Sequence, residues 1–277
     1  MAENSKIEWT DHTFNPWWGC TKVSPACDHC YAEAWAKRTG HDLWGARGER
    51  RFFGEQHWQK PLKWDREAEK SGIRARVFCA SMGDVFEWGA NLSQWREQLW
   101  QLIEATPNLD WLLLTKRPHL VSRLAPWGET WPDNVWLGMT AENQKFLDKR
   151  VDALLAVPAK YRFLSCEPLL GALDISRCAG GLDWLIAGGE SGGHARQTDP
   201  DWIRSLREQC LQYSVAFHFK QWGDWLPIDG PCRAPQFQRV GKKRAGRLLD
   251  GRTWDELPRG YDRAAVSRVR EGRQATA

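Results

Sequence analysis

The chain has 277 residues, of which 42% are hydrophobic and 27% are charged, a composition typical of a globular protein that can bury a sizeable core. These values exclude a disordered chain, and no apolar run approaches the roughly 18 residues that a membrane-spanning helix needs. Because the polar N-terminal residues lack the pattern of a secretory signal, we expect a cytoplasmic protein.

Charge is distributed unevenly along the chain. Residues 231–277 carry 12 Lys and Arg against 5 Asp and Glu, a net charge of +7, whereas residues 1–230 carry 27 against 30, a net charge of −3. The chain also holds 19 Trp but only 4 Tyr, more indole than packing alone normally recruits. We therefore expect a basic C-terminal extension over residues 230–277 that forms an anion-binding surface.

The N-terminal part predicts a strand, a cysteine-rich loop and an insertion. A strand near Thr13–Trp18 leads directly to three cysteines, and a helical segment over Tyr31–Arg38 follows them. The stretch His41–Trp64 is rich in Gly, Arg and aromatic residues. We expect it to be a long insertion over one mouth of the fold.

From residue 76 onward, short apolar runs alternate with amphipathic segments of helical period. Near-continuous apolar strands indicate burial on both faces, and their spacing fits one strand followed by one returning helix. The six runs are Arg76–Ala80, Asp110–Leu114, Asn134–Gly138, Tyr161–Ser165, Leu182–Ala187 and Val215–Phe219. The pattern predicts an α/β fold of about six or seven parallel strands over residues 1–229, either a partial TIM-type (β/α) barrel or an open doubly wound sheet.

Two of the predicted helices carry specific start signals. Ser93 is placed to cap a segment whose apolar residues form one stripe, and Asp199 precedes a first-turn proline at the start of another.

Polar clusters follow almost every predicted strand. They comprise Ser81 to Asp84, Lys116 and Arg117, Glu142, Glu167, Gly188 to Glu190, and Lys220. Because the carboxyl ends of parallel strands meet at one edge, we expect these residues to form a ring of ligand-binding loops. Lys116, Arg117 and Lys220 are then candidates for binding anionic groups of a substrate; the alternative is ordinary ion pairs at strand ends.

Three cysteines, Cys20, Cys27 and Cys30, lie within eleven residues. In a cytosolic protein such spacing favours metal or redox chemistry over disulfides. Three thiolates leave one iron of a [4Fe–4S] cluster open, whereas a structural zinc site requires a fourth ligand. The histidines available as that ligand are His12, His29 and His41. Unligated thiols are the third alternative.

The remaining cysteines form no second compact cluster. Cys79 and Cys210 fall on predicted apolar faces and are expected to pack in the core. Cys166 lies beside Glu167 at a strand end, where packing and a site role are both open. Cys178 and Cys232 stand alone.

The chain resembles the radical S-adenosylmethionine (SAM) enzymes, in which three cysteines on the loop after the first strand of a partial βα barrel hold an iron–sulfur cluster. Within that superfamily it looks closest to the three-Cys-motif proteins of phages and bacteria, an uncharacterised phage-protein family. The resembling stretches lie within residues 7–227 and are Phe14–Cys20, Cys27–Tyr31, Leu114–Pro118, Phe163–Pro168, Gly188–Gly192 and Phe219–Asp224.

This resemblance implies a [4Fe–4S] cluster on the three cysteines, with SAM bound at the open iron. It implies that an electron donor reduces the site and that a 5′-deoxyadenosyl radical abstracts a substrate hydrogen. His29 is then expected near the adenine, and Asp84 takes the place of the superfamily's Gly-Gly-Glu segment at the SAM amino group. The other SAM-binding residues expected are Ser81, Glu142, Glu167, Gly188, Gly189 and Glu190. The sequence departs from most members in having six residues between the first two cysteines, where three are usual.

Nucleobase or nucleic-acid modification is the substrate class expected from the resemblance, the Trp content and the basic extension. One rival is a zinc- or iron–sulfur-containing nucleic-acid-binding protein without SAM chemistry, which SAM binding would distinguish. Another is a metal-dependent hydrolase, which would need His and Asp clusters at the strand ends. The chain has seven His, of which His218 alone lies in a predicted strand.

Overall fold

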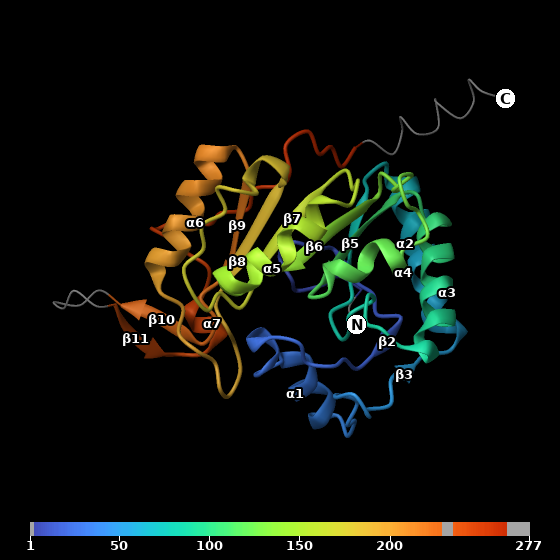
Figure 1. Cartoon of the computed structure of the whole chain (residues 1–277), viewed down its shortest axis with the longest axis horizontal. Helices are drawn as coiled ribbons and strands as arrows, with labels where there is room; N and C mark the ends of the chain where they lie inside the picture. Colours follow the sequence, from blue (N-terminus) through green and yellow to red (C-terminus); the bar gives the residue numbers. More distant parts are fainter. Residues whose placement is uncertain (1–2, 229–234, 265–277) are drawn as a thin grey trace.

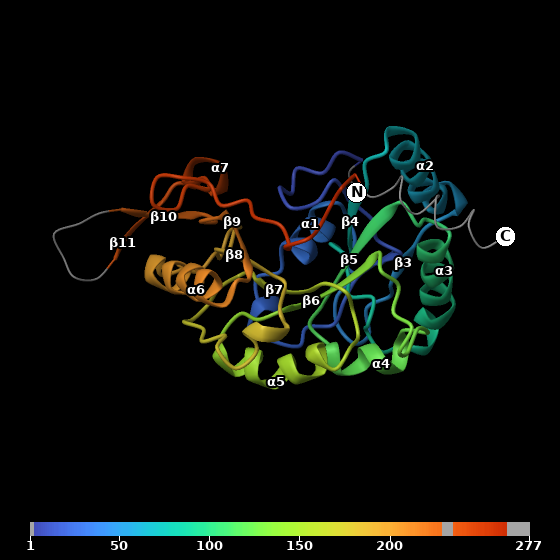
Figure 2. The same cartoon turned by 90° about the horizontal axis from the view of Figure 1, so that it is seen from above.

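The computed structural model describes residues 3–228 and 235–264. Seven parallel strands form one sheet in the order β1-β4-β5-β6-β7-β8-β9, and this sheet curls into a half-barrel (Figures 1 and 2). The strands are β1 (His12–Thr13), β4 (Ala75–Cys79), β5 (Leu109–Thr115), β6 (Val135–Thr140), β7 (Arg162–Cys166), β8 (Trp184–Gly188) and β9 (Ala216–Gln221). The predicted partial TIM-type barrel is confirmed, and the doubly wound alternative is wrong because the strand order never reverses.

The helices are α1 (Tyr31–Arg38), α2 (Glu55–Ser71), α3 (Ser93–Glu104), α4 (Val121–Leu124), α5 (Gln144–Leu155), α6 (Pro200–Tyr213) and α7 (Lys242–Ala245). Most of them lie along the outer side of the half-barrel (Figures 1 and 2). Figure 2 shows α3, α4, α5 and α6 along one side of the sheet, with the N-terminal segment and α7 on the other. Two antiparallel pairs flank the sheet, β2 (Trp17–Trp18) with β3 (Arg51–Phe52) and β10 (Trp225–Ile228) with β11 (Gln236–Arg239). Among the described residues, no helix is both long and apolar enough to cross a membrane.

Side-chain alternation along each strand divides the core into two parts. On β8, Leu185 and Ala187 pack in the outer core together with helix residues, whereas Trp184 and Ile186 belong to a separate inner cluster. The large members of the inner cluster are aromatic and almost completely buried; they are Trp9, Phe78, Trp136, Phe163 and Trp184. Packing inside the half-barrel therefore explains part of the unusually high number of Trp residues.

The N-terminal part differs from the prediction in two places. The predicted strand Thr13–Trp18 is wrong, since β1 ends at Thr13 and Trp17–Trp18 pairs antiparallel with β3 outside the barrel sheet. The predicted insertion His41–Trp64 is wrong in its second half, which forms the start of α2. There, Trp58, Pro61 and Trp64 are buried at successive spacings of three residues, so the aromatic content reflects a packed helix face.

One of the two predicted helix caps is confirmed. The Asp199 side chain accepts a hydrogen bond from the Asp201 backbone N–H at the start of α6. The prediction for Ser93 is wrong: it is the first residue of α3, and Leu92 occupies the cap position without a side-chain hydrogen bond.

The described part of the C-terminal extension lies against the barrel. The Phe219 N–H on edge strand β9 donates to the Trp254 carbonyl at 2.9 Å, and the Glu256 N–H donates to the Phe217 carbonyl at 3.2 Å. Leu249 and Trp254 are buried in the outer core. The division into a barrel over 1–229 and an extension over 230–277 stays a prediction, but Leu249 and Trp254 of the extension share the barrel's core.

Candidate functional site

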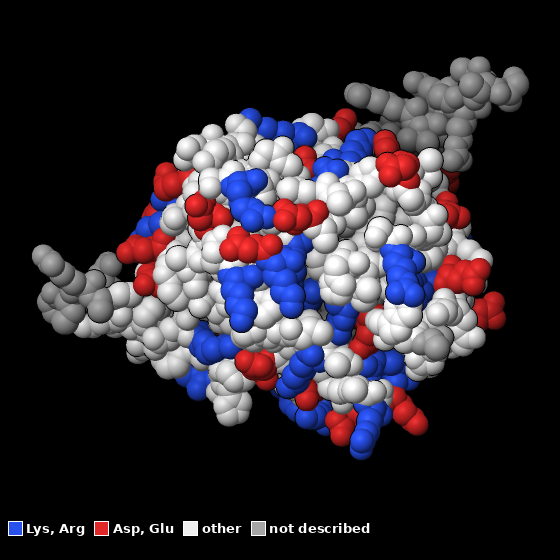
Figure 3. Space-filling view, in the orientation of Figure 1, with Lys and Arg blue, Asp and Glu red and all other residues white. Residues whose placement is uncertain are grey.

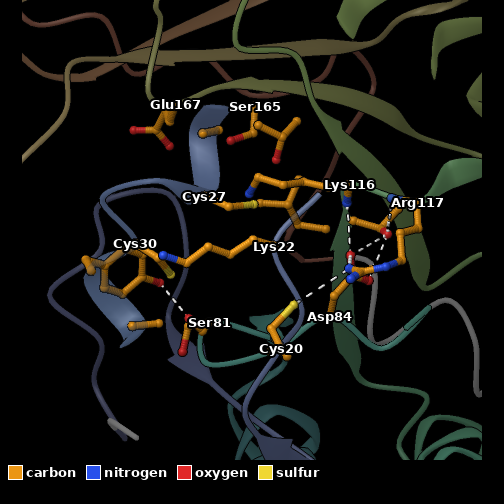
Figure 4. A pocket seen from close by; sticks show the side chains of 18 of the residues that line it. Cys20, Lys22, Cys27, Cys30, Ser81, Asp84, Lys116, Arg117, Ser165 and Glu167 are labelled. Carbon is orange, nitrogen blue, oxygen red and sulfur yellow. Dashed lines mark hydrogen bonds and ion pairs between the residues drawn. The ribbon is translucent and has the colours of Figure 1, made fainter. Parts of the chain in front are cut away.

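A cavity at the C-terminal ends of the strands brings the three predicted thiols together with residues from β4, β5 and β7 (Figure 4). It encloses about 860 Å³ including its open mouth. Cys20, Cys27 and Cys30 contribute to its wall, and the inner aromatic residues Trp9 and Phe78 also line it. The predicted ring of strand-end loops therefore surrounds one shared space.

The cysteine loop, defined here as residues 19–30, contains little regular structure. It holds one 3-10 turn over Pro25–Cys27, and Cys30 immediately precedes α1. Burial raises the pKa of the Cys20 thiol to about 12, with the Asp84 carboxylate acting in the same direction. Burial also raises the pKa of Cys30. In the absence of a cation at the site, these two thiols are held protonated at neutral pH.

The three sulfurs are spread around the cavity wall (Figure 4). Within residues 3–228 and 235–264, no group of three or more His, Cys, Asp or Glu is placed to hold a metal ion. Each histidine considered as a fourth zinc ligand has another partner: His12 stacks on Trp64, His41 contacts Arg51, and His29 contacts Glu190.

Asp84 and Arg117 form a buried ion pair beside Cys20. The Asp84 carboxylate lies 2.9 Å from Arg117 Nη1 and accepts further hydrogen bonds from the Thr115 hydroxyl and the Lys116 N–H. Arg117 also donates to Cys20 Sγ at 3.6 Å. Both predicted site residues lie at the cavity, but in this arrangement their charges neutralise each other.

Glu190 does not line the same cavity as Asp84. It accepts two hydrogen bonds from the Arg196 guanidinium, at 2.6 and 2.8 Å, and its Oε2 is 3.2 Å from His29 Nδ1. Burial favours the protonated form of Glu190, but the bonds from Arg196 and His29 outweigh burial and lower its pKa. His29 and Glu190 are thus brought together in an adjoining cavity that shares Cys30 with the first.

Lys116, Glu167 and Lys220 line both cavities. Lys220 Nζ lies 3.2 Å from Glu167 Oε1. Burial raises the pKa of Glu167, and the Lys220 ammonium opposes this effect. The Lys116 ammonium is close enough to Cys30 to favour its thiolate. These three residues present the charges best placed to meet a ligand.

The remaining predicted residues divide between the cavity and the core. Ser81 lines the cavity, and its hydroxyl accepts from Asn15 Nδ2 at 3.0 Å. Glu142 is fully buried against Arg150 on α5, at 2.7 Å, and lines neither cavity.

The glycines after β8 are explained by chain packing. A methyl group on Gly189 would overlap the Trp222 carbonyl, and one on Gly188 would lie 2.7 Å from Glu167 Oε1. The prediction that they allow close approach of SAM is therefore not needed to account for them.

Cys79, Cys166 and Cys210 are fully buried in the outer core, facing away from the cavity. The expectation of packing is confirmed for Cys79 and Cys210. Of the two alternatives for Cys166, packing in the core is the one that the structure supports. Cys178 is also buried, and Cys232 lies outside the described residues.

Four charged residues at the site were not predicted from the sequence: Lys22, Arg50, Glu87 and Arg196. Arg50 and Glu87 form a two-bond ion pair at 2.8 and 3.0 Å next to the cysteine loop. Glu87 lies three residues beyond Asp84, so it was available as a further strand-end acid. Arg50 and Arg196 lie in irregular segments, where only the fold brings them to the site.

Fold and site together define a partial (β/α) barrel protein with a thiol-lined cavity at the C-terminal ends of its strands. The chain belongs to a family described as "protein of unknown function (DUF5131)", whose sequence model matches residues 4–258. The match continues past residue 229 into the extension. Neither a curated protein nor a solved structure matches the chain.

Proposed function

We propose that the protein is a radical SAM-type iron–sulfur enzyme that modifies a nucleobase or nucleic acid. The observation that carries the proposal is the meeting of three cysteines in one cavity at the C-terminal ends of the strands of a half-barrel. Active sites of (β/α) barrels are found at this end.

The donor set suits a [4Fe–4S] cluster better than a single zinc ion. Zinc requires its ligands to converge at about 2.0–2.3 Å from one point. The three sulfurs instead lie apart on the cavity wall (Figure 4), and the nearby histidines have other partners. A four-iron cluster is wider than one ion and holds each thiolate at a different corner, so three spread thiols suit it and leave one iron open.

With SAM bound, such a cluster supplies reductive cleavage of SAM and hydrogen abstraction from a substrate. The protein's own residues position the ligands and exclude water. Lys116 and the Glu167–Lys220 pair offer opposite charges to the carboxylate and amino groups of SAM or to an anionic substrate. Trp9 and Phe78 close the cavity toward the barrel interior with apolar surface.

A nucleic-acid substrate is supported by aromatic and basic side chains near the cavity. The loop that carries Asp84 also carries Trp88, which is 57% exposed and has Arg123 stacked 4.2 Å from its ring centre. Exposed indole rings provide stacking surfaces for bases. In Figure 3, basic side chains on the visible face form several groups with acidic side chains beside them.

Anaerobic reconstitution tests the cofactor. Protein treated with iron and sulfide should take up about four irons and become brown. Replacing any one of Cys20, Cys27 or Cys30 with Ala should abolish the chromophore, while the buried Cys178→Ala variant serves as the matched control and should retain it. Iron and sulfide analysis with absorption spectroscopy measures both.

SAM binding and cleavage then separate the two main alternatives. Reconstituted protein supplied with dithionite and SAM should release 5′-deoxyadenosine, measured by chromatography. Stoichiometric zinc without iron uptake would overturn the proposal. Iron uptake with no binding of SAM would favour the alternative of an iron–sulfur nucleic-acid-binding protein.

A further inference from the structure

Three arginines connect the cysteine loop to the barrel. Arg50, Arg117 and Arg196, here called the arginine anchors, each pair with a carboxylate that follows β4 or β8 and each donate hydrogen bonds to the loop. We propose that the arginine anchors are positioning residues that fix the three thiols over the barrel before any cofactor binds.

Arg117 holds the first end of the loop. Its guanidinium is 8% exposed, pairs with Asp84 at 2.9 Å and donates to the Thr21 carbonyl at 2.7 Å. The same group donates to Cys20 Sγ at 3.6 Å. Arg117 therefore fixes both the backbone next to Cys20 and the sulfur itself.

Arg50 acts on the same end from another direction. Its guanidinium donates twice to Glu87, once to the Thr21 hydroxyl at 3.0 Å, and to the carbonyls of Leu43 and Gly48. All five N–H groups have partners, so one buried cation joins the loop, the segment after α1 and the loop after β4.

Arg196 holds the second end. It donates to Glu190 through two nitrogens and to the Pro25 carbonyl at 2.9 Å, and it lies 3.6 Å from Asp28. His29 contacts the same Glu190 carboxylate. The segment from Pro25 to His29, which lies around Cys27 and before Cys30, is thereby tied to the end of β8.

The loop needs such contacts because its own backbone supplies few. A single 3-10 turn is its only regular structure, and six residues separate Cys20 from Cys27. Charge-assisted hydrogen bonds donated by guanidinium groups are stronger than neutral ones, and they restrict the loop without requiring secondary structure. A loop ordered in advance lowers the entropy that cofactor assembly must overcome. The inference is independent of which cofactor the thiols hold.

Hydrogen–deuterium exchange on the reduced, metal-free full-length protein tests this inference. Peptides that cover the cysteine loop should exchange about tenfold faster or more in Arg117→Ala and in Arg196→Ala, because each loses a charge-assisted hydrogen bond. Peptides of β6 and β7 should exchange as in the wild type. Arg204→Ala, which removes a surface arginine paired with Asp201 and Asp250, is the matched control and should leave the loop unchanged.

Iodoacetamide labelling, with mass spectrometry to measure the rate at each cysteine, distinguishes positioning of the loop from a general stabilising role. Arg196→Ala should speed labelling of Cys27 and Cys30, while the core thiol Cys210 stays protected. The milder Arg196→Lys keeps the charge but cannot bond Glu190 twice and Pro25 together, so its effect should be intermediate. Unchanged exchange of the loop in both Ala variants would overturn the proposal. So would equal acceleration across the loop and the sheet in the Lys variant.

Discussion

Two buried histidines make the stability of the protein depend on pH. His57 on α2 is 7% exposed and His218 on β9 is 2% exposed. Burial lowers their pKa values to about 4 and about 3, respectively. Within the described part of the chain, Nδ1 of His57 and Nε2 of His218 have no hydrogen-bond partner. The Asn15 carbonyl beside His57 and the Asp255 carboxylate near His218 favour a charged ring, but the loss of hydration on burial outweighs both.

We expect the free energy of unfolding to fall as the pH drops below about 6.5. The pKa of each ring is lower in the folded protein than in the unfolded chain, so the unfolded chain binds more protons below pH 6.5. The stability present at neutral pH is therefore lost as the pH falls toward the pKa of the folded state. The expected loss is about 1–2 kcal/mol per ring between pH 6.5 and pH 5. Urea unfolding at both pH values measures it.

Variants assign this dependence to the two rings. His57→Gln and His218→Gln should each flatten the fall in stability, whereas His119→Gln, at an exposed position, should not. A pH dependence that survives in both buried variants would show that other groups cause it.

The sequence could identify the site residues that directly follow a strand. Ser81, Asp84, Lys116 and Glu167 reach the predicted cavity because parallel strands end at one edge. The partners of the charged residues were not predictable. Arg50 and Arg196 lie 37 and 6 residues from their acids, in irregular segments without periodicity, and only the folded chain brings them together. For the same reason Arg117 was predicted to bind substrate, while its guanidinium is paired with Asp84.

At the level of elements, the inner face of the sheet depends on one small residue. Gly138 on β6 lies opposite Phe163 on β7, and a methyl group at Gly138 would overlap the Phe163 ring. The Phe163 ring in turn packs against Trp9 and Trp184. Gly138 therefore provides the space in which the aromatic layer of the half-barrel assembles.

Gly138→Ala should destabilise the protein by about 1–3 kcal/mol. The added methyl group overlaps the Phe163 ring, and the packed core leaves that ring no space to move away. Gly180→Ala is the matched control: no heavy atom lies within 4 Å of the added methyl group, so its effect should stay within about 0.5 kcal/mol. Adding Phe163→Leu to Gly138→Ala should recover part of the loss. Urea unfolding measures all three, and a double variant no more stable than Gly138→Ala would contradict the steric explanation.

Periodicity predicted the central elements well and the N-terminal ones poorly. The six apolar runs from Arg76 onward correspond to β4 through β9 because each is long enough to show burial on both faces. β1 has only two residues, too few for any pattern. In α2, buried His57 and Asp65 and the internal Pro61 hide the apolar stripe, so composition suggested a loop.

On the scale of the whole molecule, the C-terminal extension contacts the sheet near both of its edge strands. At β9, Asp255 forms a bridge with His218, which covers that edge of the sheet. Toward the other edge, the Tyr261 hydroxyl donates to Asp110 on β5 at 2.7 Å, and Arg263 lies 2.7 Å from Asp11, which precedes β1.

The basic residues of the extension differ in how far they are engaged by the fold. Arg247 pairs with Asp255, and Arg252 stacks 3.6 Å from the Trp254 ring centre. Lys242, Lys243 and Arg244 are exposed on or beside α7. Among the described residues of the extension, these three and the exposed Arg259 are available for an anion-binding role, which stays a prediction.

Adjacent leucines in the extension test whether it is part of the folding unit. Leu249 is fully buried, whereas Leu248 is 58% exposed. Leu249→Ala should lower the free energy of unfolding by about 2–5 kcal/mol, because it leaves a cavity in the outer core. Leu248→Ala should change it by less than about 0.5 kcal/mol. Both are measured by urea unfolding followed by tryptophan fluorescence, with one transition expected for each variant. Equal stability of the two variants would show that the Leu249 side chain contributes nothing to the outer core, and would contradict a role of this part of the extension in the folding unit.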